Sequence, residues 1–286
     1  MGTILITGSN GNIGSAVIES LQATGFTLRA GVSRAAGQAY AGTGSTAVAC
    51  DFRDREQLLQ ALQGVDRVYL MVPFHRDMVE WGRNFVAAAS ESGVRFIVRL
   101  SALGAALDSP SAMGCLHGQI DQFVTESGID FSIVRCNSFM QNFSGHYAGM
   151  IRHGSLRLAQ GDALFSFVDT RDIARVVAKL ILAPDDFAGR TVNLHGSQRL
   201  SNHAAVDLIS NVTGKPLEYV PLTDEEQARR LSRAGIGEWE QAVLRSLDNC
   251  FRKGFAVGDP CELEQLLDRD ALLFKVFAQD YRHQWL

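Results

Sequence analysis

The chain has 286 residues, of which 46% are hydrophobic and 20% are charged, and its formal net charge is −4. A chain of this length and composition can bury a sizeable core, so it fits one large α/β domain or such a domain with a smaller annex. The slight negative charge gives no general attraction to nucleic acid, and no apolar run approaches the roughly 18 residues of a membrane span.

A glycine triplet follows the first predicted strand. The apolar run at residues 3–6 leads directly into Gly8, Gly11 and Gly14, which have GxxGxxG spacing. Glycine at these points lets the chain turn sharply and lets a pyrophosphate approach the main chain, while the phosphates bind at the start of the next helix. The alternative is that these are ordinary loop glycines, but the flanking strand and helix favour a dinucleotide site.

The end of the second predicted strand indicates which dinucleotide is bound. An apolar helix pattern and a strand over residues 26–32 complete a βαβ opening. A site for NAD usually carries Asp or Glu here to bind the ribose 2′-OH, yet no carboxylate occurs between Glu19 and Asp51. Ser33 and Arg34 stand there instead and could donate to a 2′-phosphate. We therefore expect NADP(H), although Arg34 could also be a solvated loop residue.

Strands and helices continue to alternate along the chain. Strands are predicted over residues 46–50, 66–72, 96–100 and 131–135, and helices over residues 56–62, 77–92 and 116–127. This alternation predicts a doubly wound parallel sheet of the Rossmann type, whose ligands bind at the carboxyl ends of the strands.

The pattern loosens after residue 140. Strands are predicted over residues 165–169, 191–194 and 218–220, with a helix over 172–182 and mainly helical sequence from 201 to 286. We expect residues 1–140 to form an NADP-binding Rossmann domain. Residues 141–286 then form a smaller, mainly helical substrate-cleft subdomain that is interleaved with the sheet.

Cysteine and histidine usage favours a cytoplasmic protein without a metal. The five cysteines are scattered and never have CxxC spacing, and the histidines show no paired ligand spacing. Reduced thiols of this kind are typical of the cytosol. The first strand begins so early that no signal peptide is expected before it.

The chain resembles the NmrA-like family of atypical short-chain dehydrogenases/reductases, which includes quinone reductases, triphenylmethane-dye reductases and redox-sensing regulators. The resemblance covers essentially the full length and rests on the glycine turn, Ser33-Arg34, Asp51, Val72-Pro73, His117, Arg135 to Asn142 and Val168 to Ala174.

The resemblance implies a set of cofactor-binding residues. Asp51 and Phe52 would lie by the adenine, although Asp51 could instead cap a helix or face solvent. The segment 72–74 would lie beside the ribose and nicotinamide. The full set is Gly8, Asn10, Gly11, Asn12, Ile13, Gly14, Ser33, Arg34, Asp51, Phe52, Met71, Val72, Pro73, Phe74, Ser101, Ala102, Leu103, His117, Cys136 and Asn137.

The acid–base pair of typical short-chain dehydrogenases is absent. Those enzymes use Tyr-x-x-x-Lys, and the matching positions here are Met113 and His117. His117 is a candidate catalytic residue because imidazole titrates near neutrality. It could equally be a structural histidine that hydrogen-bonds the cofactor.

An apolar substrate cleft is expected. The residues assigned to it are Phe74, Phe139, Met140 and Phe143, which would suit a flat aromatic acceptor, although such side chains can also be core residues.

Two functions follow from these observations. The first is an NADPH-dependent reductase that transfers hydride to a quinone-like or other conjugated hydrophobic acceptor, for which proximity and orientation are the main requirement. The second is a non-catalytic NADP(H)-binding redox sensor that acts through a regulatory protein partner. The partner expected besides the small acceptor is a second copy of the chain, as a homodimer, or a regulatory protein.

Overall fold

The chain forms two compact units in the computed structural model, which describes residues 2–33 and 44–286. Each unit is assembled from three separate stretches. The first unit comprises Met1–Leu107, Leu116–Arg135 and Ile173–Val192, and the second comprises Asp108–Cys115, Cys136–Asp172 and Asn193–Leu286.

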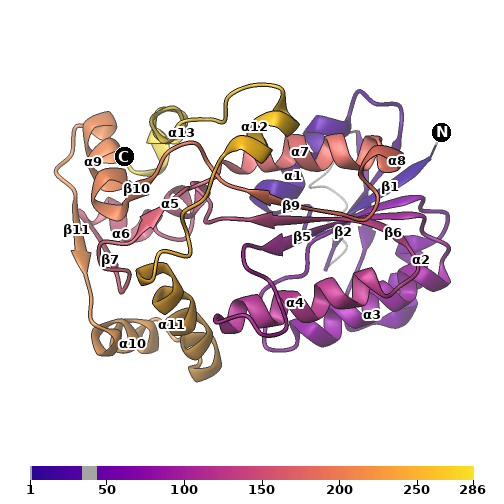
Figure 1. The fold of residues 1–286 in the computed structure, drawn as a ribbon, viewed down its shortest axis with the longest axis horizontal. Coiled ribbons are helices and arrows are strands. Elements are labelled where there is room, and N and C mark those ends of the chain that lie inside the picture. The colour runs from indigo at the N-terminus through magenta and orange to yellow at the C-terminus, as the bar shows by residue number, and fades with distance from the viewer. Residues whose placement is uncertain (1, 34–43) are drawn as a thin grey trace. The chain divides into compact units, whose positions relative to one another are not determined.

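A seven-stranded sheet has the order β3-β2-β1-β4-β5-β6-β9 (Figure 1). Its strands are β1 (Thr3–Ile6), β2 (Thr27–Val32), β3 (Ser45–Ala49), β4 (Arg67–Leu70), β5 (Phe96–Ala102), β6 (Asp130–Cys136) and β9 (Arg190–Leu194). The strand β1 pairs in parallel with β2 and β4, and the pairs β2–β3 and β4–β5 are also parallel. The doubly wound sheet predicted from the sequence is therefore confirmed.

Helices cover both faces of this sheet (Figure 1). One face carries α2 (Arg55–Leu62), α3 (Met78–Glu91) and α4 (Ala112–Thr125), and the other carries α1 (Asn12–Leu21), α7 (Thr170–Leu182) and α8 (Pro184–Phe187). The helix α4 begins four residues before the predicted start, since the serine-rich stretch before residue 112 ends sooner than its composition indicated.

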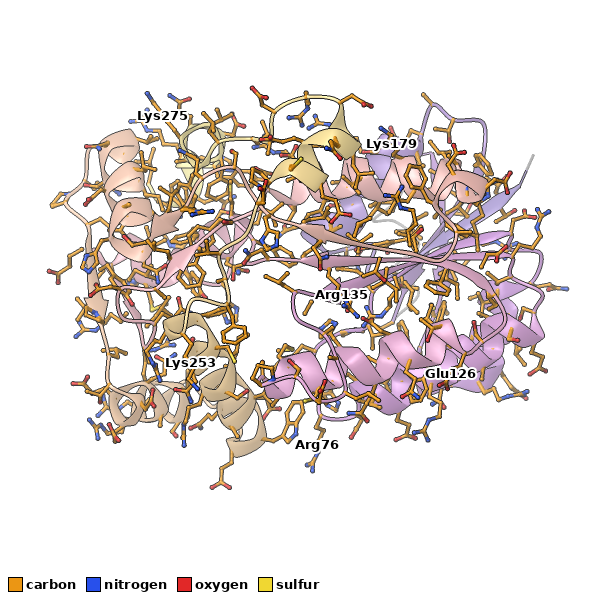
Figure 2. All side chains as sticks on the ribbon, viewed as in Figure 1. Arg76, Glu126, Arg135, Lys179, Lys253 and Lys275 are labelled. Carbon is orange, nitrogen blue, oxygen red and sulfur yellow. The ribbon has the colours of Figure 1, made fainter. Side chains whose placement is uncertain are left out.

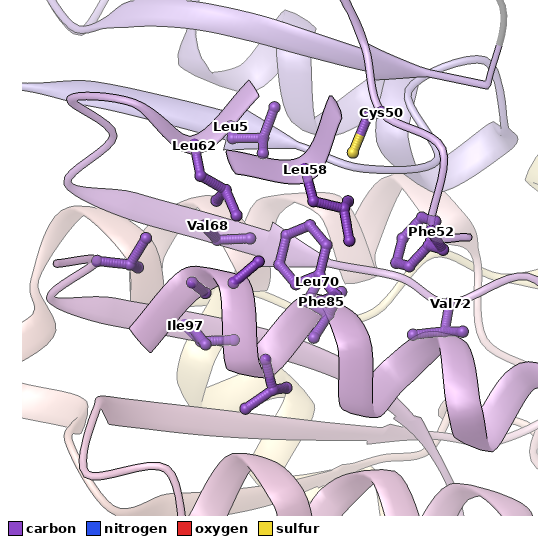
Figure 3. Close-up of a cluster of buried hydrophobic side chains, with 14 of the residues drawn as sticks. Leu5, Cys50, Phe52, Leu58, Leu62, Val68, Leu70, Val72, Phe85 and Ile97 are labelled. Atoms are coloured by element: carbon purple, nitrogen blue, oxygen red, sulfur yellow. The ribbon is translucent and has the colours of Figure 1, made fainter. Parts of the chain in front are cut away.

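The core of the first unit lies between the sheet and α2 and α3 (Figure 3). Leu58 from α2 and Phe85 from α3 pack against Val68 and Leu70 of β4, and all four are fully buried. Because β4 is covered on both faces, its sequence is almost continuously apolar, as parallel strands usually are.

The second unit combines helices with two small sheets. Its elements are α5 (Gln141–Ser144), α6 (Ala148–Arg152), β7 (Ser155–Leu158), β8 (Leu164–Phe165), β10 (Leu200–Ser201), α9 (Asn202–Thr213), β11 (Glu218–Pro221), α10 (Asp224–Arg233), α11 (Glu238–Arg252), α12 (Cys261–Leu267), α13 (Phe274–Asp280) and the 3-10 helix η1 (Arg282–Gln284). The strands β7 and β11 pair in parallel, whereas β8 and β10 are antiparallel.

The predicted strand over residues 165–169 is wrong for most of its length, since β8 contains only its first residue. The main-chain N–H groups of the next residues do donate hydrogen bonds, but their acceptors are carbonyl oxygens of loops. Ser166 N donates to Ala256 O, and Val168 N donates to Ser138 O, with distances of 2.8 and 3.0 Å. The apolar alternation here reflects burial without a continuous strand partner.

An aromatic cluster forms the core of the second unit. The ring of Phe143 makes edge-to-face contacts with Phe167 and Phe274, at centroid distances of 5.2 and 5.1 Å. Trp285 is 1% exposed, and its indole N–H donates to the carbonyl oxygen of Phe143 at 2.8 Å. The last residues of the chain are thereby held in this core. No helix among the described residues is both long and apolar enough to cross a bilayer.

Candidate functional site

The glycine turn of the first unit leaves a helix end open to an anion. Gly8 has a φ of +59°, and a Cβ built on Gly14 would lie 2.3 Å from Gly8 O, so the turn tolerates no side chain there. The helix α1 begins just after Gly11, which makes no side-chain cap, and its first turn holds no acidic residue. Its first N–H groups and its dipole therefore favour a bound phosphate.

Side chains within the first unit fix the turn to the neighbouring strands. Thr7 Oγ1 accepts from the main-chain N–H of Met71 at 2.7 Å, which joins the end of β1 to the end of β4. Ser9 Oγ donates to the carbonyl oxygen of Gly31 in β2 at 2.8 Å. These bonds place the turn at the carboxyl ends of three adjacent strands, where ligands of such sheets bind.

The residues predicted at the adenine end lie beyond β2 and β3. Ser33 is exposed after β2, whereas Arg34 lies outside the described residues. Asp51 follows β3 and binds the guanidinium of Arg53 through both carboxylate oxygens, and these bonds hold the pKa of Asp51 below its usual value. Phe52 is buried in the core and packs on Phe85, so little of its ring is available to a ligand.

The segments after β4 and β5 present a mixture of buried and accessible side chains. Val72 is buried, whereas Pro73 and Phe74 are exposed, the latter by 42%. Ser101 is buried and Leu103 is half-buried, as is Ala102. Met71 is also half-buried, and its side chain packs against Gly8. Because β1 to β5 run in parallel, the first unit brings these predicted residues to one sheet edge.

A buried charge network lies beneath this edge. Asp121 of α4 accepts a hydrogen bond from Ser101 Oγ at 2.8 Å and pairs with Arg135 of β6 at 3.3 Å. Arg99 of β5 is fully buried, and its Nε lies 3.9 Å from the same carboxylate. In Figure 2 the side chain of Arg135 lies between β6 and α4. The two arginines supply the charge that an ionised Asp121 requires in a buried position.

The network also determines the protonation state of His117. Arg99 Nη2 lies 3.2 Å from His117 Nδ1. A guanidinium can only donate, so Nδ1 must accept and the ring proton must be on Nε2. Burial and the positive charge of Arg99 lower the pKa of His117 to about 3. At neutral pH this side chain is therefore a neutral hydrogen-bond donor, which fits ligand binding better than proton release.

The other predicted residues belong to the second unit and are largely committed to its packing. Cys136 is buried, and burial raises the pKa of its thiol. Asn137 Nδ2 donates to the carbonyl oxygen of Ala256 at 2.8 Å. Met140 and Phe143 are buried in the aromatic core, while Phe139 is half-buried.

The second unit contains a cavity of about 280 Å³. Small-molecule sites typically have volumes of about 300–1,000 Å³, so this space suits an acceptor of one or two rings. Its apolar wall includes Phe165, Phe167 and Phe251, and the rings of Phe165 and Phe251 meet at a centroid distance of 5.0 Å. The charged side chains of Asp248 and Arg230 also line the cavity.

A chain of side-chain amides holds Asp248. Asn202 Nδ2 donates to Gln160 Oε1 at 2.9 Å, and Gln160 Nε2 donates to Asp248 Oδ1 at 2.9 Å. Asp248 is 5% exposed, and its burial raises the pKa of the carboxyl group to about 6. A carboxyl group with this pKa is partly protonated near neutral pH, as a general acid must be.

Sequence reasoning missed Asp248, Gln160 and Arg230. One signal was available for the first of them, because Asp248 interrupts the buried side of the amphipathic helix α11 between Leu247 and Cys250. A carboxylate on an apolar face is rarely buried without a partner. The partner Gln160 is 88 residues distant, so no local pattern could have identified it.

Comparison with known proteins gives matches along nearly the whole chain. The sequence model of the NmrA-like family matches residues 1–265. The NAD(P)H azoreductase of Xenophilus azovorans is 30% identical over 284 residues, which cover 96% of each chain.

Solved structures extend these matches. The NADPH-dependent quinone oxidoreductase QOR2 of Escherichia coli, complexed with NADPH, has a TM-score of 0.84 and 26% identity, with 97% of this chain and 99% of that chain covered. NmrA, a negative transcriptional regulator solved with NADP, has a TM-score of 0.78 and covers 98% of this chain and 95% of its own. Its identity is 14%, so that likeness shows the fold alone.

Proposed function

The chain belongs to the NmrA-like family, and from this premise we propose that it is an NADPH-dependent reductase of a conjugated, hydrophobic acceptor such as a quinone or an azo compound. The observation that carries the proposal is the glycine turn, which ends at a helix N-terminus free of capping and acidic side chains. Relatives whose names include NAD(P)H azoreductase and NADPH-dependent quinone oxidoreductase support the reaction class.

NADP(H) fits the residues of the first unit. The pyrophosphate would bind at the turn between Gly8 and Gly14, where a Cβ would fill the space that the main chain needs. When bound, the cofactor supplies the hydride. The protein binds and orients it at the carboxyl ends of β1 to β5, and the Nε2–H group of His117 is available there as a fixed donor.

The second unit supplies a place for the acceptor. Its cavity offers aromatic faces for a flat ring and polar groups for a carbonyl or azo nitrogen. Binding energy that holds such an acceptor in a reactive orientation replaces much of the acid–base catalysis that typical short-chain dehydrogenases obtain from tyrosine and lysine.

Oxidation of NADPH tests this function. We expect loss of nicotinamide absorbance when the protein is mixed with NADPH and 1,4-naphthoquinone or azobenzene, at a higher kcat/KM than with NADH. A parallel titration measures the affinity for each dinucleotide without an acceptor. Tight NADPH binding with no oxidation across a panel of quinones and azo compounds would contradict the reductase and leave a dinucleotide-binding sensor.

A further inference from the structure

We propose that Asp248 is the acid that protonates the acceptor as it is reduced, and that the acceptor binds in the cavity of the second unit that this carboxyl group lines. The inference rests on the proposed reductase function. It assigns a proton donor to a chain that has Met113 and His117 in place of the usual tyrosine and lysine.

The position of the carboxyl group carries the argument. Oδ1 of Asp248 is held by Gln160, whose own carbonyl is held by Asn202, so the carboxyl group has a fixed orientation. The hydrogen bond from Gln160 is made to Oδ1 and leaves the other carboxyl oxygen, Oδ2, uninvolved, and Asp248 lines the cavity beside Phe251 of the same helix. Oδ2 is therefore available to a ligand carbonyl or azo nitrogen.

Neighbouring charges keep this carboxyl group able to release its proton. Burial raises its pKa to about 6, and Asp224 of α10 acts in the same direction, whereas Arg230 of α10 and Arg252 of α11 lower it. His146 and Tyr147 also line the cavity, and burial raises the pKa of the Tyr147 hydroxyl to about 12, which makes Tyr147 a weaker acid than Asp248. The pKa of Asp248 lies close to neutral pH, which favours general acid catalysis at neutral pH.

The hydride from NADPH and the proton from Asp248 together complete the reduction of the acceptor. A quinone gains a hydride, which NADPH supplies, at one end of its conjugated system, and its oxygen gains the proton of Asp248, which gives the hydroquinone. An azo group gains the hydride on one nitrogen and the proton on the other, which gives the hydrazine. The Asp248 carboxylate then regains a proton from water, so one proton is consumed per NADPH oxidised.

Asp248→Asn separates proton transfer from binding. The amide keeps the acceptor oxygen for Gln160 and places an N–H group where Oδ2 was, so it can donate a hydrogen bond but cannot give up a proton. We expect the kcat for azobenzene reduction to fall about 100-fold, at the lower end of typical general-acid effects, while the NADPH dissociation constant is unchanged. Asp207→Asn makes the same chemical change on an exposed helix residue and should alter neither quantity.

Binding without turnover supplies a second measurement. In the absence of NADPH, we expect the wild-type affinity for 1,4-naphthoquinone to fall above about pH 6, as Asp248 loses the proton that it donates to the carbonyl. The affinity of Asp248→Asn should be independent of pH. The wild-type kcat should fall about tenfold per pH unit above the same pH.

The outcomes are distinct. If wild-type kcat and quinone affinity do not change between pH 5 and 8, the inference is wrong even if the variant fails to fold. If Asp248→Asn folds and keeps the wild-type kcat and pH profile, the inference is again wrong while the reductase function stands. If the wild type oxidises no NADPH with any acceptor, the proposed function fails, and the inference fails with it.

Discussion

His117 shows how one neighbour can change the chemistry of a residue. Imidazole usually titrates near pH 6.5 and suits proton transfer. Here Arg99 donates to Nδ1, and both burial and the guanidinium charge disfavour a second proton on the ring. The residue that the sequence presented as a candidate acid is therefore a fixed, neutral donor.

The tautomer of His117 can be measured directly. We expect long-range ¹H–¹⁵N correlation spectra to show a neutral His117 ring with its proton on Nε2 throughout the range from pH 8 down to about pH 5, because its pKa is lowered to about 3. The ring is protonated near pH 6.5 in the unfolded chain but only near pH 3 in the folded protein. The free energy of unfolding therefore decreases as the pH falls from about 6.5 toward 3. An imidazolium signal from His117 at pH 5.5 would contradict this assignment.

Arg34 carries the expected preference for NADPH. Replacing it with alanine removes a cationic donor from the position where a 2′-phosphate would bind, so we expect Arg34→Ala to weaken NADPH binding at least tenfold and NADH binding much less. Fluorescence titration with both dinucleotides measures the difference. Equal losses of affinity for NADPH and NADH would contradict the NADPH preference that we infer from the absence of a carboxylate between Glu19 and Asp51.

At the scale of the element, the junction between β1 and α1 depends on close main-chain approach. A Cβ on Gly14 would lie 2.3 Å from Gly8 O, and neither main-chain segment can move freely because Thr7 and Ser9 bond to neighbouring strands. The turn and the start of helix α1 therefore hold each other in place. The phosphate site is built into this junction.

Gly14→Ala tests the junction. We expect the substitution to lower NADPH affinity by at least tenfold and to reduce the melting temperature, because the turn must open to admit the methyl group. Gly149→Ala is the matched control, since that glycine also lies in a helix and a Cβ there meets nothing within 4 Å. A Gly14→Ala protein with wild-type NADPH affinity would show that the turn is not the phosphate site.

Features that depend on neighbouring residues could be predicted from the sequence, whereas features that depend on distant contacts could not. The glycine turn and the strands up to β6 are local patterns, so their order and fold class were predicted correctly. The strand over residues 165–169 was not, because these residues are all buried and the main-chain N–H groups of Ser166 and Val168 donate to Ala256 and Ser138. The cavity around Asp248 is lined by residues from five separate segments, 138–147, 158–167, 202, 227–231 and 244–251, which no local pattern joins.

At the scale of the whole molecule, the last residues help to hold the second unit together. Trp285 is buried and bonds to Phe143, while Lys215 Nζ donates to the carbonyl oxygen of Leu286 at 2.9 Å. The chain end therefore packs as part of the core rather than as a loose tail.

Trp285→Ala tests this anchoring. Truncating a buried tryptophan typically costs about 3–5 kcal/mol, so we expect the melting temperature measured by circular dichroism to fall by roughly 10 °C. Leu286→Ala changes a side chain that is 59% exposed and should shift the melting temperature by less than about 2 °C. Equal, small shifts in both variants would show that the second unit does not need its last residues.

The alternation of the two units along the chain has a consequence for synthesis on the ribosome. The first unit needs Ile173–Val192, so its sheet cannot gain β9 until nearly 200 residues have been made. A nascent chain cut off at residue 140 would leave β6 as an open edge and the face beneath α7 uncovered. Such an intermediate presents a surface that chaperones recognise, and pausing during translation in this interval would expose it to aggregation for longer.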